Sequence, residues 1–504
     1  MKRRTILTAL ALIGGASATG CGSSGGDATA ATTDTLRYVS IGSPATASDD
    51  PHGGLGNESD ALRFALVYDV LTGQGPDGRT VPRLAESWQP DDTLTRWRFT
   101  LRKNATFSDG RPVRAADVLY SLRRIERKAA ENYGRLSSFD MAASRVIDDH
   151  TVEIVSRTPF AEVPRALESM TFIVPDGSDD FTAAVPGSGP FRLVGNDGQT
   201  AVLERRDGWW GPAPSLRRVE VRAVADPQAR AQAVLSGQVD VAASIAPAAA
   251  KQAEGRDDVS LVRRPAVTMY PFVMRLDRKP FDDPRVREAI KLAADRPALV
   301  ESVYLGYGQT ADDVLAPADP SAPNGPARRA RDLAKAKQLL AEAGHAGGLA
   351  LTLHTTTSYP GMDTAATLFA GQLAEAGITA NVRLEPPDTY FTTVWAQKDF
   401  YTGYFGGIPF FDVARVALLS GSPTNETAWR RPEFDTALNA ALAEPDETAR
   451  NAALGVLQQQ IRDEGGYVVW GTGEGLDLTR RGVEGLPTGA GFGRLFIDQV
   501  RISG

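Results

Sequence analysis

The sequence predicts a mixed α/β protein that is built from more than one domain. Its 504 residues exceed what a single hydrophobic core usually organises. Segments that alternate apolar and polar residues, as strands do, recur between segments with helical periodicity. Strands that alternate with helices at this spacing are typical of mixed α/β domains. With 42% hydrophobic and 23% charged residues, the composition is that of an ordinary globular protein.

Individual elements can be placed from these patterns. The clearest strand is 96–102, where three apolar residues alternate with arginines and one threonine. The segment 285–305 has helical periodicity with a break near Arg296, because Pro297 cannot continue a helix. Other strands are expected at 36–40, 217–224, 239–243, 349–355 and 378–384, and other helices at 63–71, 115–125, 227–237, 335–343 and 362–376.

The first 20 residues are expected to be an export signal. Three cations at positions 2–4 precede an apolar stretch at 5–13, which is too short for a convincing membrane span. The four residues that end at Cys21, Ala-Thr-Gly-Cys, resemble a bacterial lipobox, so Cys21 is the expected site of lipidation and the mature N-terminus. A plain secretory signal and the twin-arginine route remain open. The Gly-, Ser- and Ala-rich segment 21–34 is expected to be a flexible tether to the membrane.

Composition excludes several function classes. The formal net charge of −7 argues against nucleic-acid binding, which needs a basic excess. Cys21 is the only cysteine, so the chain can build neither a disulfide nor a cysteine-based zinc site. The four histidines lie far apart in the sequence, and we expect no metal site and no cofactor. These histidines are His52, His150, His345 and His354.

Eight blocks, in order along the chain, resemble one known family. They are PRLAESW at 82–88, WRFTLR at 97–102, FSDGRPV at 107–113, ADVLYSLRR at 116–124, GPF at 189–191, WWG at 209–211, LSGQVD at 235–240 and PFDDPRVREAI at 280–290. Together they resemble the peptide-, nickel- and oligosaccharide-binding lipoproteins known as ABC-transporter solute-binding protein family 5. The resemblance covers essentially the whole mature chain.

The resemblance implies a type II, cluster C-like periplasmic-binding-protein fold, with two α/β lobes, a hinge and an extra subdomain. It implies a monomer that captures a small solute between its lobes. It also implies delivery of this solute to the permease and ATPase of an ABC importer, from an anchored position outside the cytoplasm. The expected domains are lobe I from 35–52, 186–264 and 482–504, an extra subdomain of lobe I from 53–185, and lobe II from 265–481.

The resemblance also suggests where the solute binds. Dipeptide-binding relatives pair the peptide amino group with an Asp and the carboxylate with an Arg, because both charges must be paired in a closed cleft. In this sequence Gly407 falls at the Asp position and Thr357 at the Arg position, whereas Tyr359 matches. We therefore expect free dipeptides to bind weakly, unless Asp412 or one of two arginines, Arg383 and Arg415, supplies the missing charge.

Further candidates lie in loops that reach the cleft in relatives. The loop 401–412 is rich in aromatic and small residues, which suits apolar side chains, sugar rings or flat molecules; a small core under the loop is the alternative interpretation. The candidate ligand-binding residues are Ser43, Tyr359, Tyr404, Phe405, Gly407, Phe411, Asp412, Asn425 and Trp429.

The sequence carries no enzyme motif that we recognise. It lacks a G-x-S-x-G elbow, a phosphate-binding loop and an HExxH motif. The Gly-rich segments 471–475 and 489–493 do not fit dinucleotide spacing and are expected to be loops. We expect no catalysis; a secreted hydrolase that uses Asp412 and Glu474, and a receptor for signalling, are the alternatives.

Overall fold

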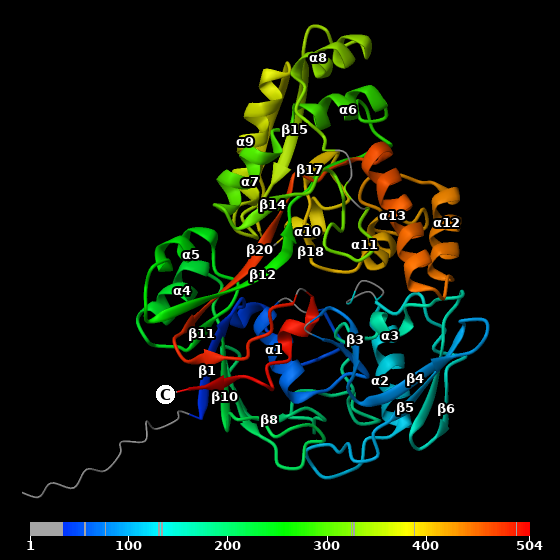
Figure 1. Ribbon diagram of the computed structural model, residues 1–504, viewed down its shortest axis with the longest axis vertical. Helices are drawn as coiled ribbons and strands as arrows, with labels where there is room; N and C mark the ends of the chain where they lie inside the picture. The colour runs from blue at the N-terminus through cyan, green and yellow to red at the C-terminus, as the bar shows by residue number, and fades with distance from the viewer. Residues whose placement is uncertain are drawn as a thin grey trace, which may run out of the picture.

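The protein consists of two lobes that stand one above the other (Figure 1). This computed structural model describes residues 34–54, 57–75, 77–129, 132, 135–323, 325, 328–387, 389–489 and 491–503. The expected signal, Cys21 and the tether lie outside the described residues. Lobe I contains both ends of the described chain, and lobe II contains most of its second half.

Lobe I is organised by a nine-stranded mixed sheet. Its order is β18-β12-β20-β11-β1-β10-β9-β8, and β14 pairs with β20. The strand β1 pairs in parallel with both β10 and β11, whereas β8, β9 and β10 form antiparallel pairs. The strands are β1 Thr35–Ser40, β8 Phe191–Asn196, β9 Thr200–Arg205, β10 Arg218–Ala223, β11 Val241–Ala242, β12 Val259–Met269, β14 Gly308–Thr310, β18 Phe405–Gly406 and β20 Gly471–Arg480.

Helices and short segments complete lobe I. The helix α1 contributes a run of buried apolar residues to the core that lies against β1, β8 and β10. The helices are α1 Glu58–Val67, α4 Pro227–Leu235 and α5 Pro247–Ala253, with 3-10 turns η1 Pro44–Thr46 and η2 Phe492–Leu495. Two small sheets pair β2 Thr72–Gln74 with β3 Thr80–Pro82, and β21 Val483–Glu484 with β22 Arg501–Ile502.

The extra subdomain is a four-stranded antiparallel sheet that packs on one long helix. Its strand order is β4-β5-β7-β6. In β5 the side chains of Trp97, Phe99 and Leu101 are buried while Arg96 and Arg98 are exposed, which confirms the alternation expected from the sequence. The elements are β4 Ala85–Pro90, β5 Arg96–Leu101, β6 Arg145–Asp148, β7 Thr151–Val155, α2 Ala115–Arg127 and α3 Val163–Ala166.

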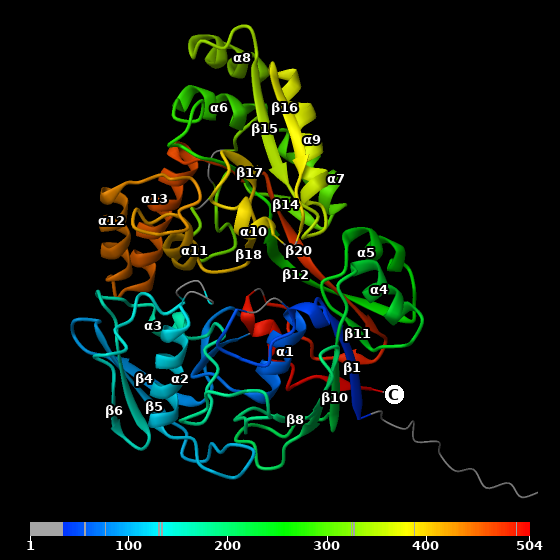
Figure 2. The same ribbon diagram turned by 180° about the vertical axis from the view of Figure 1, so that it is seen from behind.

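Lobe II has its own five-stranded sheet and a ring of helices (Figure 2). The strand order is β16-β15-β17-β13-β19, and β15 is parallel to both of its neighbours. The strands are β13 Phe272–Met274, β15 Leu349–Thr355, β16 Ile378–Leu384, β17 Phe400–Thr402 and β19 Tyr467–Val468. The helices are α6 Pro284–Ala293, α7 Arg296–Tyr304, α8 Leu333–Glu342, α9 Met362–Glu375, α10 Tyr390–Thr393, α11 Phe410–Ala417, α12 Pro432–Leu442 and α13 Glu447–Glu464.

Two long strands connect the lobes. β12 and β20 pair antiparallel along their length and run from one lobe into the other (Figure 1). The pairing shifts between Arg264 and Thr268, a β-bulge that bends a strand pair locally. The expectation that 471–475 is a loop is wrong, because this segment begins β20. Its glycines make room for α7: a Cβ at Gly473 would lie 2.5 Å from the Tyr304 ring.

Most sequence-based elements are found with small shifts at their ends. The expected break near Arg296 separates α6 from α7, where Asp295 caps α7 by accepting a hydrogen bond from the Ala298 amide. The helix expected at 63–71 instead spans Glu58–Val67, because it begins after Asn57 rather than within the apolar run. Among the helices of the described segments, none has the length and apolar character needed to span a bilayer.

Candidate functional site

A row of aromatic rings lies where lobe II meets the hinge. Tyr359, which follows β15, stacks on Tyr404 with ring centroids 3.8 Å apart and planes within 4°. The row continues from Tyr404 to Tyr270, to Tyr304 and to Trp470, with centroid separations of 6.3, 6.1 and 5.1 Å. Tyr359 and Tyr404 remain half-buried, whereas the other three rings are buried. The structure therefore brings two predicted residues together as an accessible aromatic surface.

Lobe I places a charged pair opposite this surface. Glu58 begins α1, and both of its carboxylate oxygens accept hydrogen bonds from Arg494, at 3.2 and 3.0 Å. The Ser244 hydroxyl also donates to Glu58, at 3.1 Å. Burial disfavours the carboxylate, but Arg494 outweighs it and holds the pKa of Glu58 below its usual range. Burial raises the pKa of the Tyr404 hydroxyl well above its ordinary value, and Tyr359 and Glu58 add to this effect, so Tyr404 lies within electrostatic reach of lobe I.

Ser43 lies beside this pair in lobe I. It precedes η1, and its amide donates to the Asn57 side chain at 3.2 Å, next to the start of α1. The Ser43 hydroxyl is 3.0 Å from the hydroxyl of Thr46.

A buried ion pair stabilises the hinge behind the site. Arg264 on β12 and Asp477 on β20 are each 3% exposed and form a bidentate pair. Asp477 also accepts a hydrogen bond from the Ser244 amide at 2.9 Å. Through Ser244, the pair therefore connects lobe I to both hinge strands. Removing one partner of such a pair would leave an uncompensated buried charge.

A second contact between the lobes lies at the extra subdomain. Phe411, in α11 of lobe II, is 4% exposed and packs into the core of the subdomain, with its ring centroid 5.6 Å from that of Phe160. Two ion pairs flank this contact, Arg165–Asp319 at 2.9 Å and Arg450–Glu162 at 2.5 Å. The side chain of Phe411 thus holds the lobes together instead of facing an open cleft.

Arg135 is a half-buried cation at the same junction. Its loop faces α11, because Arg415 donates a hydrogen bond to the Ser137 hydroxyl at 3.2 Å. Arg135 is half-buried, donates to the Met170 carbonyl at 3.0 Å and forms no ion pair with any carboxylate of the described chain. Burial and the nearby Arg415 lower the pKa of Arg135 to about 10, against the opposing effect of Asp412.

The pKa values of two acidic residues near this junction are raised. Asp412 is half-buried, and burial raises its pKa although Arg415 lies 3.4 Å away. Glu168 is 7% exposed, and burial raises its pKa to about 7 against hydrogen bonding from Thr80. The junction is thus a region where water is scarce and charges need partners.

The other predicted residues serve the fold around the site. The Asn425 side chain donates to three backbone carbonyls, those of Leu418, Leu419 and Trp429, and so closes the loop before α12. Trp429 is 2% exposed and packs on Phe434. Phe405 is buried in β18.

The two positions where dipeptide-binding relatives carry their charged residues are Thr357 and Gly407 in this chain. In the sequence, Thr357 precedes Tyr359 by two residues and Gly407 follows Tyr404 by three. Gly407 is half-buried, and a Cβ on Gly491 of lobe I would lie 3.5 Å from its carbonyl oxygen. Gly407 therefore faces lobe I at close range. Thr357 is exposed.

Metal ligands do not gather in the described part of the chain. No group of three His, Cys, Asp or Glu side chains there has the geometry to hold a metal ion. His52 is buried and lies 2.7 Å from the Phe172 carbonyl, and burial lowers its pKa to about 4. His354 bonds to Glu385.

Two α/β lobes that are joined by a two-strand hinge have the architecture of a solute-binding protein of the periplasmic-binding-protein type. Residues 79–426 match the model of the bacterial extracellular solute-binding proteins, family 5. The chain belongs to this family, which confirms the resemblance seen in the sequence. Family members are extracytoplasmic binding proteins that serve ABC importers, and they are substrate-binding proteins rather than enzymes.

Several known proteins are similar over nearly the whole chain. The glutathione-binding protein GsiB of Escherichia coli K12 is 27% identical over 451 residues, which cover 85% of this chain and 87% of GsiB. The binding protein AgaA from A. tumefaciens R10, solved with agropinic acid, has a TM-score of 0.79 at 24% identity and covers 93% of this chain and 99% of AgaA. DppA from Helicobacter pylori, solved with the peptide STSA, has a TM-score of 0.80 at 22% identity, with 94% and 98% covered.

Proposed function

We propose that this chain captures a small organic solute that bears a carboxylate, an oligopeptide or another organic acid, and delivers it to the permease and ATPase of an ABC importer. The observation that carries the proposal is Arg135, a half-buried guanidinium at the junction of the lobes that forms no ion pair within the described chain. The proposed ligand-binding set adds Arg135 to the nine residues expected from the sequence. Four of these nine, Phe405, Phe411, Asn425 and Trp429, are buried and would support the site from behind.

The physical argument is one of charge compensation. A guanidinium withdrawn from water without a counter-charge loses several kcal/mol of solvation. The carboxylate of a solute restores this loss through a bidentate charge-assisted pair, which a planar guanidinium is shaped to make. Arg135 is therefore the proposed anchor for the acidic group of the solute.

The aromatic surface supports the rest of the assignment. The half-buried stack of Tyr359 and Tyr404 offers a flat, apolar face to a ligand. Relatives are consistent with an acidic organic solute: GsiB is named for glutathione and AgaA was solved with agropinic acid. Both compounds carry carboxylates.

The remaining parts of the proposal follow the sequence. We infer a lipid on Cys21 and a tether over 21–34 that hold a monomer at the outer side of the cell membrane. The domain limits that we propose are those expected from the sequence, except that α1 is assigned to lobe I, because it packs on the sheet of that lobe. The chain acts as a receptor and returns its solute unchanged, which distinguishes it from a secreted hydrolase. Delivery to a permease distinguishes it from a signalling receptor.

Calorimetry tests the anchor. Glutathione is the first probe, followed by the solute that native mass spectrometry of the host protein identifies. We expect Arg135→Gln to weaken binding about thirtyfold, since loss of a charged hydrogen-bonding partner costs about 2 kcal/mol. Arg192→Gln, at an exposed pair with Glu204 on β8, is the control and leaves binding unchanged. Equal affinity of wild type and Arg135→Gln would refute the anchor.

A further inference from the structure

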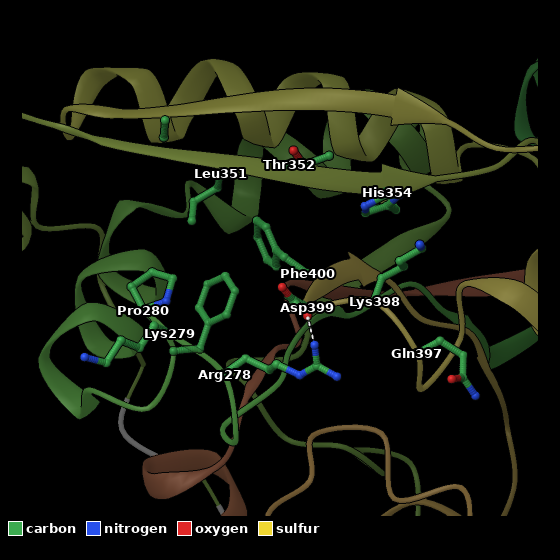
Figure 3. A pocket seen from close by; sticks show the side chains of 12 residues that line it. Arg278, Lys279, Pro280, Leu351, Thr352, His354, Gln397, Lys398, Asp399 and Phe400 are labelled. Carbon is green, nitrogen blue, oxygen red and sulfur yellow. Dashed lines mark ion pairs between the residues drawn. The ribbon is translucent and has the colours of Figure 1, made fainter.

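A cavity of about 470 Å³ opens on lobe II, apart from the tyrosine row (Figure 3). Three chain segments line it: 278–281 between β13 and α6, residues of β15 from 350 to 354, and 397–400 ahead of β17. None of its lining residues belongs to the site between the lobes. Its volume falls within the range of pockets that hold small molecules.

The rim of this cavity is cationic. Arg278, Lys279 and Lys398 are exposed around its mouth, and Asp399 is the single acidic residue among the lining side chains. Asp399 pairs with Arg278 at 3.5 Å, as the dashed line in Figure 3 marks. Neither lysine forms an ion pair with a carboxylate of the described chain. In a protein of net charge −7, two rim lysines without acidic partners in the described chain favour an anionic ligand.

The floor of the cavity carries an oriented histidine. His354 is 9% exposed, and its Nδ1 lies 2.7 Å from the Glu385 carboxylate, which also pairs with Arg383 at 2.9 Å. The carboxylate accepts the Nδ1 proton, so in the neutral ring Nε2 is left as a hydrogen-bond acceptor. No group of the described chain bonds to Nε2. A ligand with a hydroxyl or N–H group would satisfy it.

The inner wall is apolar. Phe281 and Phe400 are each 1% exposed, their ring centroids lie 5.4 Å apart, and Leu351 is 8% exposed beside them. These side chains come from three different segments and hold the wall rigid, because both rings belong to the core of lobe II. An aromatic or aliphatic group fits such a wall better than water does.

We propose that this cavity is a second binding site, specific for a small organic anion that carries an apolar group and one hydrogen-bond donor. The cationic rim attracts the anionic group, Nε2 of His354 accepts a hydrogen bond from the donor, and the wall of Leu351, Phe281 and Phe400 receives the apolar part. The site is independent of solute binding between the lobes, since the two share no residue.

Ligand-detected NMR on the whole protein tests this site. The probe is 4-hydroxyphenylacetate, which has a carboxylate, a ring and a hydroxyl donor; its neutral amide is the comparison ligand. We expect the acid to bind and the amide to bind much more weakly. The double variant Lys279→Gln/Lys398→Gln should weaken the acid roughly tenfold. The matched variant Lys103→Gln/Lys337→Gln removes two exposed lysines elsewhere and should leave binding unchanged.

A third variant separates this site from the cleft between the lobes. Arg135→Gln should leave binding of the probe unchanged, because Arg135 lies at the lobe junction. The proposal is overturned if the acid does not bind at millimolar concentration, if the amide binds equally well, or if Arg135→Gln removes binding while the Lys279/Lys398 variant retains it.

Discussion

Replacing Phe411 with alanine should open the lobes without unfolding either of them. Phe411 belongs to α11 of lobe II, yet its side chain is buried among residues of the extra subdomain, against Phe160. Separation of the lobes exposes this ring and the apolar pocket that receives it. The substitution therefore removes free energy from the closed arrangement and little from the open one.

The size of the effect follows from the buried ring. Burying a Phe side chain stabilises the buried state by about 2 kcal/mol. Loss of this term shifts the ratio of closed to open protein about thirtyfold towards the open form. If unliganded wild type is mostly open, the affinity for the solute falls by about this factor. If it is mostly closed, the unliganded variant instead opens and its radius of gyration rises.

Small-angle scattering and calorimetry on the same samples measure both quantities. Phe369→Ala is the matched control, because Phe369 is 0% exposed and stacks on Phe272 within lobe II. This control should lower the melting temperature and leave both the scattering profile and the affinity unchanged. If Phe411→Ala alters neither the radius of gyration nor the affinity, the reasoning about the lobe contact is wrong.

Three further predictions concern the lipid on Cys21, the identity of the solute and the dependence of stability on pH. Cys21→Ser should release the protein into the medium with unchanged solute affinity, and a membrane-bound variant would contradict the lipid assignment. Free dipeptides should not bind below micromolar Kd in calorimetry, because Gly407 and Thr357 lack the counter-charges; tight binding of any dipeptide would disprove this. Burial raises the pKa of Glu168 to about 7, so the folded state holds more protons than the unfolded state between pH 4.5 and 7, and stability falls as pH rises through this window. Glu168→Gln should therefore raise the unfolding free energy at pH 8 by about 1–3 kcal/mol and not at pH 4, and equal gains at both pH values would argue against a buried, titrating Glu168.

Local patterns predicted the elements well, because the signals that define them are local. The alternation at Trp97, Phe99 and Leu101 and the proline after Arg296 act over a few residues, and both gave the observed elements. The glycines of 471–475 led to the wrong prediction of a loop, because their signal is also local. A loop and a strand crowded by α7 both favour small residues, and only the tertiary contact with Tyr304 separates them.

The site was harder to predict, because its residues meet only in three dimensions. Tyr359 came from an aligned position in the family pattern and Tyr404 from the aromatic loop 401–412, and their stacking followed from neither segment alone. Arg135 carries no signal in the sequence, since it is one arginine among many in a chain rich in them. Its interest arises from burial without a carboxylate partner, a property of the folded junction. For Phe411, the sequence showed the aromatic loop to which it belongs, but it did not predict that the side chain packs into the core of the extra subdomain.

The central claim is that this chain holds one small organic acid between its lobes and does not alter it. Native mass spectrometry of the protein purified from its host tests this most directly, with the released small molecule compared against the same compound before binding. The account predicts a single bound organic acid that leaves on denaturation with its mass unchanged and rebinds to the refolded protein. Release of a chemically converted molecule, or a bound solute without an acidic group, would contradict it.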